Sequence, residues 1–407
     1  MIRKLPPFSS AEDVFSKFKR REAVETTISM SQSPHVCFVS DTIHTYFGSG
    51  VEQGVGGAER QQYMIAKSLQ NDGFPVSIVT LDYDNNPSPD TIDDIEVWKK
   101  IPDKRGVLNA PLKAISVLRV LRHVDADVYY VRGNDFLCIV TALYCRLSGS
   151  KFVYAVANDT NVEPEHLQNK NPTLTKLYLA AMRSAHHITV LTPHQRKVLA
   201  REHGIESTVV PCGYDLPPNE EVLDHDRREF VLWVGRLDHD QKRPERFLTL
   251  AESLSNVPFV MIGPPDNDDQ DNSYFNHIKG RAEKINNVEF IEFVPPDEIH
   301  KYFRKASIFV NTSAYEGFGN TFLEAWRYAT PVVTVEYTLH GEITDRDVGI
   351  QADSVEELSY IVENLHQDAR KRHTLGWNGR ELVQEQYSME FVTDQYREIF
   401  LSCKLSL

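Results

Sequence analysis

Two glutamates bracket a glycine-rich turn in the segment Glu316-Gly-Phe-Gly-Asn-Thr-Phe-Leu-Glu324. The segment follows an apolar run at 307–311 that predicts a strand, and it opens a predicted helix. Glycines let the backbone turn tightly near a ligand, and amides at a helix N-terminus favour a phosphate. The turn can bring both carboxylates to one side of a cleft, where they can accept hydrogen bonds from sugar and ribose hydroxyls. We expect a phosphate-bearing ligand to contact Gly317, Phe318, Gly319, Asn320 and Thr321.

Two cations follow another predicted strand in the segment Gly235-Arg-Leu-Asp-His-Asp-Gln-Lys-Arg-Pro-Glu245. Arg236 and Lys242 thus stand at the carboxyl end of a strand. Such a pair can hold a diphosphate and neutralise the charge that builds up when the diphosphate leaves. Asp238 and Asp240 resemble a metal-binding pair, but acidic pairs with this spacing recur along the chain. We therefore expect no metal site at these residues. Gly235, which ends the strand, is expected to lie against the bound ligand.

A third segment, Gly54-Val-Gly-Gly-Ala-Glu-Arg60, is glycine-rich and leads into a helical pattern at 58–69. It nearly matches a dinucleotide-binding fingerprint, but Glu59 stands at the position of the third glycine and a long loop precedes the stretch. The match alone is weak. It is compatible with a loop that closes, through Gly56 and Gly57, over a phosphate of one substrate or over a second substrate.

Short apolar runs alternate with amphipathic helical stretches from residue 35 onward, and this pattern occurs twice. Runs that are apolar on both faces suit parallel sheets buried under helices. The runs predict a first set of strands at 36–40, 76–81, 127–131, 152–157, 187–191 and 207–211, and a second set at 229–235, 258–263, 288–293, 307–311 and 331–335. The pattern predicts an α/β protein with two doubly wound, Rossmann-like domains that face each other across a cleft.

The same pattern sets the expected domain boundaries. We expect an N-terminal extension at 1–34, a first domain at 35–212, a Pro-rich linker at 213–226, a second domain at 227–385 and a final helical segment at 386–407 that packs back on the first domain. In the extension, Val14, Phe15 and Phe18 stand among basic residues. Residues 1–33 form either a basic amphipathic helix that touches an anionic membrane or a loosely docked extension, and we favour the second interpretation.

The composition is that of an acidic globular protein. The 407 residues include 44 Lys and Arg and 58 Asp and Glu, which gives a formal net charge of −14. This balance argues against broad nucleic-acid binding, which needs a basic surface. The apolar run at 136–145 is too short to cross a bilayer and is expected in the core. No signal-peptide pattern is visible and the five cysteines lack metal-ligand spacing, so we expect free thiols in a reducing cytoplasm.

Together these three segments resemble those of the retaining GT-B glycosyltransferases of the family 4 type, also described as glycosyl transferases group 1. GGAER resembles the N-terminal loop of that family, GRLDHDQKRPE its diphosphate-binding segment, and EGFGNTFLEA its E-x7-E element. The stretches ADVYYVRG and TPHQRKVLAREHGIESTVVPCGYD are also similar to family segments. The likeness covers about residues 35–400, with the motifs in the order of the family.

The resemblance implies a nucleotide-sugar donor in the second domain and a saccharide or lipid-linked acceptor mostly in the first. It implies that Arg236 and Lys242 bind the donor diphosphate, that Glu316 contacts the sugar hydroxyls and that Glu324 contacts the ribose. The acceptor would attack the anomeric carbon on the same face that the leaving phosphate occupies, and that phosphate would assist its deprotonation, so that no protein nucleophile is required. We also expect no cofactor and no metal.

Two segments depart from the family pattern. Many relatives carry a His-Asp pair where this chain has Asn158 and Asp159, and a different loop stands at 338–349. We expect Asn158 and Asp159 on the acceptor and sugar side of the cleft. The sequence leaves open the sugar, the base and the acceptor. A non-catalytic nucleotide-sugar-binding protein and a GT-B epimerase or phosphorylase remain alternatives, although no separate motif for the latter two is visible.

Overall fold

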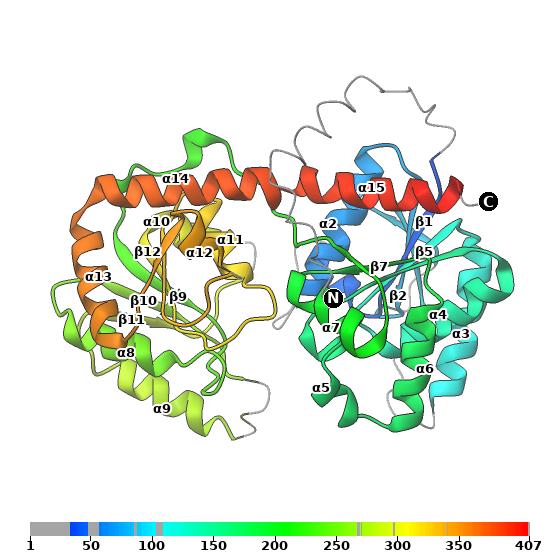
Figure 1. Ribbon diagram of the computed structural model, residues 1–407, viewed down its shortest axis with the longest axis horizontal. Helices are drawn as coiled ribbons and strands as arrows, with labels where there is room; N and C mark the ends of the chain where they lie inside the picture. The colour runs from blue at the N-terminus through cyan, green and yellow to red at the C-terminus, as the bar shows by residue number, and fades with distance from the viewer. Residues whose placement is uncertain are drawn as a thin grey trace, which may run out of the picture.

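The computed structural model describes residues 33–47, 57–84, 88–102, 109–266, 269, 271–295, 298–339 and 341–405. These residues form two α/β domains joined by two chain crossings (Figure 1). The extension at 1–32 and the glycine-rich loop up to Gly56 lie outside the described residues.

The first domain is built on an eight-stranded sheet of order β3-β4-β2-β1-β5-β6-β7-β8, parallel except for β3. Its strands are β1 (Val36–Val39), β2 (Val76–Leu81), β3 (Asp90–Ile92), β4 (Ile95–Ile101), β5 (Val128–Arg132), β6 (Lys151–Ala155), β7 (His187–Val190) and β8 (Thr208–Val209). Its helices are η3 (Ile43–Tyr46), α2 (Gly57–Asn71), α3 (Ala110–Val124), α4 (Asp135–Ser148), η5 (Asp159–Asn161), α5 (Pro164–Gln168), α6 (Pro172–Arg183) and α7 (Pro193–His203). Buried side chains of α3, α4 and α6 cover one face of the sheet, and those of α2 cover the other.

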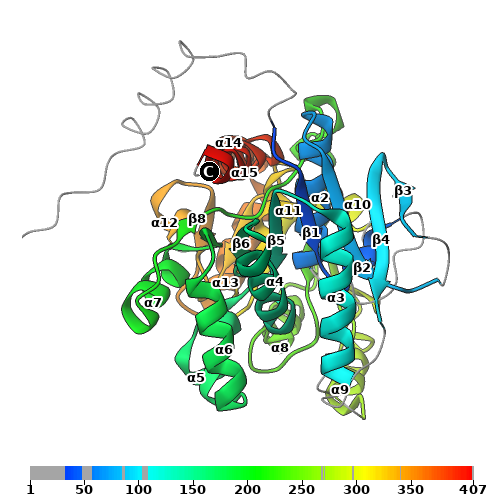
Figure 2. The same cartoon turned by 90° about the vertical axis from the view of Figure 1, so that its right-hand side faces the viewer.

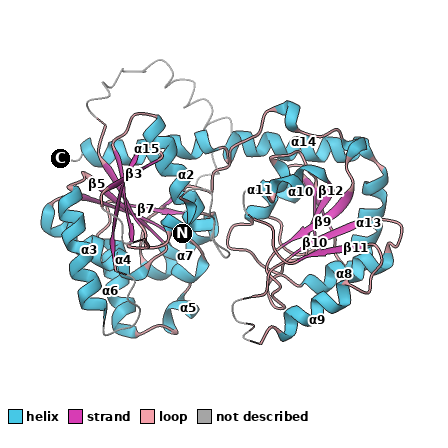
Figure 3. Cartoon of the chain, turned by 180° about the vertical axis from the view of Figure 1, so that it is seen from behind, coloured by secondary structure: helices cyan, strands magenta, loops and turns pink. Residues whose placement is uncertain are grey.

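The second domain is built on a six-stranded parallel sheet of order β11-β10-β9-β12-β13-β14. Its strands are β9 (Phe230–Val234), β10 (Phe259–Ile262), β11 (Val288–Ile291), β12 (Ala306–Asn311), β13 (Val332–Thr334) and β14 (Gly349–Gln351). Its helices are α8 (Pro244–Ser253), α9 (Ser273–Ala282), α10 (His300–Lys305), α11 (Asn320–Trp326), α12 (Glu342–Asp345), α13 (Val355–Gln367) and α14 (Ala369–Gln386). Helices again cover both faces of the sheet (Figure 3), and the two sheets confirm the predicted pair of Rossmann-like domains.

The two chain crossings between the domains touch each other. The first carries the short 3-10 helices η6 (Asn219–Glu221) and η7 (His225–Arg227), and the second joins α14 to α15 (Met389–Leu405), which runs back over the first domain (Figure 1). The Tyr214 amide donates to the Tyr387 carbonyl at 2.8 Å, and the Met389 amide donates to the Tyr214 carbonyl at 3.1 Å. Gln61 of α2 bonds both backbone groups of Gly213. These bonds hold the two crossing segments against each other and against α2 of the first domain.

The sequence pattern missed a hairpin and an edge strand. β3 and β4 turn at Asp93 and Asp94, both with positive φ, which is the geometry of a two-residue hairpin turn. The run at β4 was missed because its inward positions include Lys99, whose ammonium is buried and paired with Asp84 and Asp90. The short β14 was missed as well. All five cysteines are free and buried. In the described parts of the chain, we find no helix whose length and apolar character would suit a bilayer crossing.

Candidate active site at the interdomain cleft

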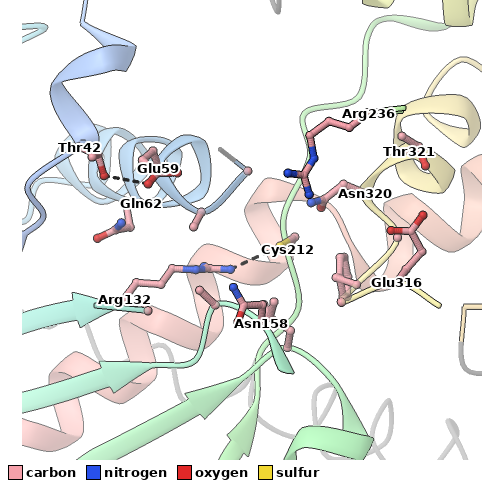
Figure 4. Close-up of a pocket in the computed structure, with 18 of the residues that line it drawn as sticks. Thr42, Glu59, Gln62, Arg132, Asn158, Cys212, Arg236, Glu316, Asn320 and Thr321 are labelled. Atoms are coloured by element: carbon pink, nitrogen blue, oxygen red, sulfur yellow. Dashed lines mark hydrogen bonds between the residues drawn. The ribbon is translucent and has the colours of Figure 1, made fainter. Parts of the chain in front are cut away.

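A cavity of about 650 Å³ opens between the carboxyl ends of the two sheets (Figure 4). Loops after β1, β5, β6 and β7 line it from the first domain, and loops after β9 and β12 line it from the second. Its lining contains the predicted site residues Gly57, Asn158, Gly235, Arg236, Lys242, Glu316, Gly317, Phe318, Gly319, Asn320 and Thr321. The structure therefore brings together residues that are far apart in the sequence.

Lys242 and Glu316 form an ion pair in the wall of this cavity. The Lys242 Nζ atom donates to both carboxylate oxygens of Glu316 at 2.7 Å. The side chains are 15% and 8% exposed, so the pair is largely shielded from water. Ser313 Oγ and Asn311 Nδ2 also donate to Glu316 Oε1, at 2.8 and 3.3 Å. This network of charge-assisted hydrogen bonds fixes the positions of the carboxylate and of the ammonium group.

The backbone that carries Lys242 is tied to the backbone that carries Glu316, because β9 and β12 are neighbours in the sheet. Thr312 Oγ1 donates to the Lys242 carbonyl at 2.7 Å and accepts from Trp233 Nε1 at 2.9 Å. The Ala314 amide donates to the Gln241 carbonyl at 2.8 Å. Gly235 gives room for this arrangement, because a Cβ there would lie 3.2 Å from the Trp233 ring and 3.5 Å from Lys242 Cδ.

Arg236 is the second cation that the second domain contributes. Its side chain is 49% exposed and donates to Asp266 at 3.0 Å. The Asp238 carboxylate accepts from the Gln241 amide at 2.7 Å and thereby shapes the loop. Among the described residues, no group of three or more His, Cys, Asp or Glu side chains is arranged to hold a metal ion. The expected absence of a metal stays a prediction.

The glycine-rich turn packs tightly behind the cavity. Gly319 has φ of 84°, and a Cβ there would lie 2.9 Å from the Tyr337 ring. Tyr337 donates its hydroxyl to the Phe318 carbonyl at 3.1 Å. Burial, together with the charge of Glu316, raises the pKa of Tyr337, so this hydroxyl stays protonated. In the described part of the chain, the buried Oδ1 atom of Asn320 has no hydrogen-bond partner, and it is a group available to a ligand.

Gly319→Ala tests this turn. The substitution should lower the free energy of unfolding by about 1–3 kcal/mol, measured by urea denaturation, because alanine disfavours the left-handed backbone and its Cβ would press against the Tyr337 ring. Gly280→Ala in α9 is the matched control, because nothing lies within 4 Å of its Cβ position and alanine favours a helix by about 1 kcal/mol. Equal stabilities for the two variants would contradict this interpretation of the turn.

The first domain contributes polar residues for which sequence analysis found no role. Arg132 is the last residue of β5, and its side chain reaches Cys212 Sγ at 3.5 Å (Figure 4). It is 6% exposed, and its Nε atom has no partner among the residues that the structure describes. Burial raises the pKa of the Cys212 thiol, which is therefore neutral and does not balance the charge of Arg132. The signal that could have found Arg132 is a charged residue at the end of a strand that is otherwise apolar.

Asp41 and Asn134 also line this side of the cavity. Asn134 caps α4 by accepting from the Leu137 amide at 2.9 Å, and it donates to Asp41 at 3.2 Å. Asp41 accepts a bond from Lys113 at 3.3 Å. The first domain thus presents hydrogen-bonding groups from loops at the same edge of its sheet.

Several predicted residues do not line the cavity. Glu324 is 17% exposed and lies 3.6 Å from Arg327 within its own helix. Asp159 accepts from Gln195 Nε2 at 2.8 Å. Their proposed contacts with substrate stay predictions. Gly56 belongs to the loop outside the described residues.

Two facing Rossmann-like domains with the ligand cavity at the carboxyl ends of both sheets define the GT-B class of fold. Comparison with known families agrees. Residues 55–217 match the family model described as Glycosyltransferase Family 4, and residues 218–382 match the one described as Glycosyl transferases group 1. The chain belongs to the GT-B glycosyltransferases of the family 4 type.

Individual relatives are distant. The lipopolysaccharide core biosynthesis glycosyltransferase LpsE of Rhizobium meliloti is 26% identical over 162 residues, which cover 38% of this chain and 46% of LpsE. The sucrose-phosphate synthase of Thermosynechococcus elongatus superposes with a TM-score of 0.74 at 18% identity, over 92% of this chain and 100% of that one. Anabaena HepE, solved in complex with UDP and glucose, superposes with a TM-score of 0.68 at 17% identity, over 91% of this chain and 100% of the HepE chain. The chain spans less than half of the length of the curated relatives that it matches.

Proposed function

We propose that this protein is a retaining, metal-independent glycosyltransferase. It would move a sugar from a nucleoside-diphosphate sugar to a saccharide or lipid-linked acceptor in the cytoplasm, in the synthesis of cell-surface polysaccharide or glycoconjugate. The observation that carries the proposal is the buried Lys242–Glu316 pair, with Arg236 in the same cavity wall. The lipopolysaccharide-core relative and the UDP-bound neighbour support the choice of pathway and donor class.

In the proposed reaction the bond between the anomeric carbon and the diphosphate oxygen breaks, and the acceptor oxygen forms the new glycosidic bond on the same face. The acceptor proton passes to the departing phosphate. Lys242 and Arg236 neutralise the charge that develops on the diphosphate, and Glu316 accepts hydrogen bonds from the sugar hydroxyls. Catalysis then rests on positioning and on charge stabilisation in the interdomain cleft.

A donor screen tests this function. The purified protein is incubated with UDP-, GDP- and ADP-sugars, and release of the nucleoside diphosphate is measured with and without candidate acceptors. We expect slow hydrolysis of one donor class and faster release when an acceptor is present. Binding of a donor without any release would instead support a non-catalytic nucleotide-sugar-binding protein.

Arg132 lies on the acceptor side, so its replacement should affect transfer more than donor hydrolysis. Loss of a hydrogen bond from a charged group costs about 1.5–3 kcal/mol, so Arg132→Met should lower the kcat/KM for the acceptor by about 10- to 100-fold. Hydrolysis of the donor alone should change by less than about twofold. Arg132→Lys keeps the charge and should recover part of the transfer, while unfolding temperatures report on the fold. Parallel loss of transfer and hydrolysis in a folded Arg132→Met protein would contradict the acceptor-side role.

A further inference from the structure

Three cationic side chains line the cavity in the described part of the chain, and one of them has no anionic partner there. Lys242 is paired with Glu316 at 2.7 Å, and Arg236 is paired with Asp266 at 3.0 Å. Arg132 is only 6% exposed, and none of the described Asp or Glu residues forms an ion pair with it. The described residues therefore leave one buried cation of the cavity without a counterion.

The position of Arg132 in the fold explains its burial. It ends β5, which lies in the middle of the first sheet between β1 and β6 (Figure 2). Helices cover both faces of this sheet, so a side chain at the end of β5 is enclosed. The guanidinium extends from the first domain toward Cys212, while Arg236 and Glu316 lie on the other side of the cavity (Figure 4). Arg132 thus belongs to a different wall of the cavity from the cations of the second domain.

The groups that contact the guanidinium of Arg132 are neutral. One is the Cys212 thiol, a weak acceptor that lies 3.5 Å from the Nη2 atom. The Tyr130 hydroxyl also interacts with the guanidinium, and burial raises the pKa of this phenol, so it carries no charge. The Nε atom has no hydrogen-bond partner among the described residues. Because an arginine side chain keeps its proton in proteins, Arg132 is a buried positive charge that its neighbours do not balance.

The acids on the same side of the cavity bond to other groups. Asp41 accepts from Lys113 at 3.3 Å and from Asn134 at 3.2 Å. Glu59 accepts from Thr42 Oγ1 at 2.8 Å. Both carboxylates are thus engaged elsewhere.

A ligand can supply the missing negative charge. A buried charge without a counterion costs free energy, so buried charges in proteins are normally paired. A guanidinium binds phosphate and carboxylate groups through two parallel hydrogen bonds. Binding such a group in the cavity would give Arg132 both a counterion and the hydrogen bonds that it lacks among the described residues.

We propose that Arg132 binds an anionic group of the acceptor, either a phosphate or a carboxylate. The donor diphosphate is expected on Arg236 and Lys242, so Arg132 holds a second, separate anion. An uncharged acceptor leaves the buried cation unpaired and therefore binds more weakly. The assignment of this anion to the acceptor rests on the proposed function, but the anion site itself does not.

Titration of small anions into the full chain tests the site without an activity assay and without knowledge of the sugar. Inorganic phosphate and acetate are the probes, and calorimetry measures their dissociation constants. Arg236→Met serves as the background, because it weakens the donor site. In this background, Arg132→Met should weaken the binding of at least one probe by about tenfold or more, the equivalent of one charged hydrogen bond. The probe with the larger loss decides between phosphate and carboxylate.

Arg183→Met is the matched control, placed in the same background. Arg183 is an exposed arginine of the first domain that donates to the His203 carbonyl at 3.0 Å and does not line the cavity. This variant should bind both probes within about twofold of the background. Arg132→Met should keep or raise the unfolding temperature, because methionine has a similar length and removes an unpaired buried charge. Equal binding of both probes with and without Arg132 would overturn the proposal.

The anion site and the proposed function fail separately in these experiments. Anion binding that depends on Arg132, in a protein that hydrolyses no sugar donor, would keep the site and reject the glycosyltransferase. Donor turnover by a protein whose anion binding does not depend on Arg132 would keep the enzyme and reject the site. With an active enzyme, an anionic acceptor should lose its advantage in kcat/KM over its neutral counterpart by about tenfold or more in Arg132→Met. An unchanged advantage would show that Arg132 does not bind the acceptor anion.

Discussion

Lys242→Ala should lower the turnover of the sugar donor by about 100-fold or more, the effect expected when a preorganised, largely buried charge stabiliser is removed. The ammonium lies in the cavity wall, is 15% exposed, and is held by two hydrogen bonds to Glu316. The Thr312 bond to the Lys242 carbonyl fixes the backbone behind it. Because the charge is fixed before the reaction begins, little free energy is spent on reorienting it. Single-turnover release of the nucleoside diphosphate measures the effect.

The control for Lys242 is Arg246→Ala. Arg246 is a cation of the same region that bonds Glu336 and does not line the cavity. Exposed ion pairs contribute about 0–1 kcal/mol, so this variant should keep nearly normal turnover. Removing Lys242 also leaves the buried Glu316 carboxylate without its cation, so urea denaturation must accompany the kinetics. A folded Lys242→Ala enzyme with normal turnover would contradict the assignment to the leaving diphosphate.

Glu316→Gln should lower turnover by about 10- to 100-fold, the equivalent of one charged hydrogen bond of about 1.5–3 kcal/mol. The amide has nearly the shape of the carboxylate but carries no charge. Oε1 accepts from Lys242, Ser313 and Asn311, and an amide cannot satisfy all of these donors and still accept from a sugar hydroxyl. We therefore expect loss of both the fixed ammonium and the sugar contact.

The comparison for this variant is Glu336→Gln, which removes a charge from a 41% exposed carboxylate that bonds Arg243 and Arg246. Turnover should stay within about twofold, because such exposed pairs contribute little. The Glu316 change should lower kcat more than it raises the donor KM if the interaction strengthens in the transition state. An effect on KM alone would limit Glu316 to ground-state binding of the donor.

Sequence patterns predicted the pair of Rossmann-like domains and the residues that the second domain contributes to the cavity. The central strands of both sheets are apolar on both faces, so their pattern was clear. The strand–turn–helix context of Arg236, Lys242 and Glu316 placed them at one edge of the second sheet. The sequence could not predict the hydrogen-bond partners of these side chains. The bonds from Ser313 and Asn311 to Glu316 depend on the path of a loop, which no local pattern encodes.

Other features depended on tertiary contacts. Lys99 is buried in β4 only because Asp84 and Asp90 fold over it, so its strand had no continuous apolar pattern. Arg132 at the end of β5 is buried beside Cys212, which belongs to a distant segment, so its burial could not be predicted from the local sequence. Glu324 lies 3.6 Å from Arg327, a neighbour one turn along its own helix, and its contact with the substrate stays a prediction. The apolar character of α4 was visible, whereas the exposure of its outer face at Leu143 and Leu147 was not.

The most direct measurement is a crystal structure of the protein with a nucleoside diphosphate bound. We expect the diphosphate to lie between the two domains, with its oxygens about 2.7–2.9 Å from the nitrogens of Arg236 and Lys242 and next to the turn at 317–320. A nucleotide found outside this cavity, or a diphosphate that touches neither cation, would contradict it.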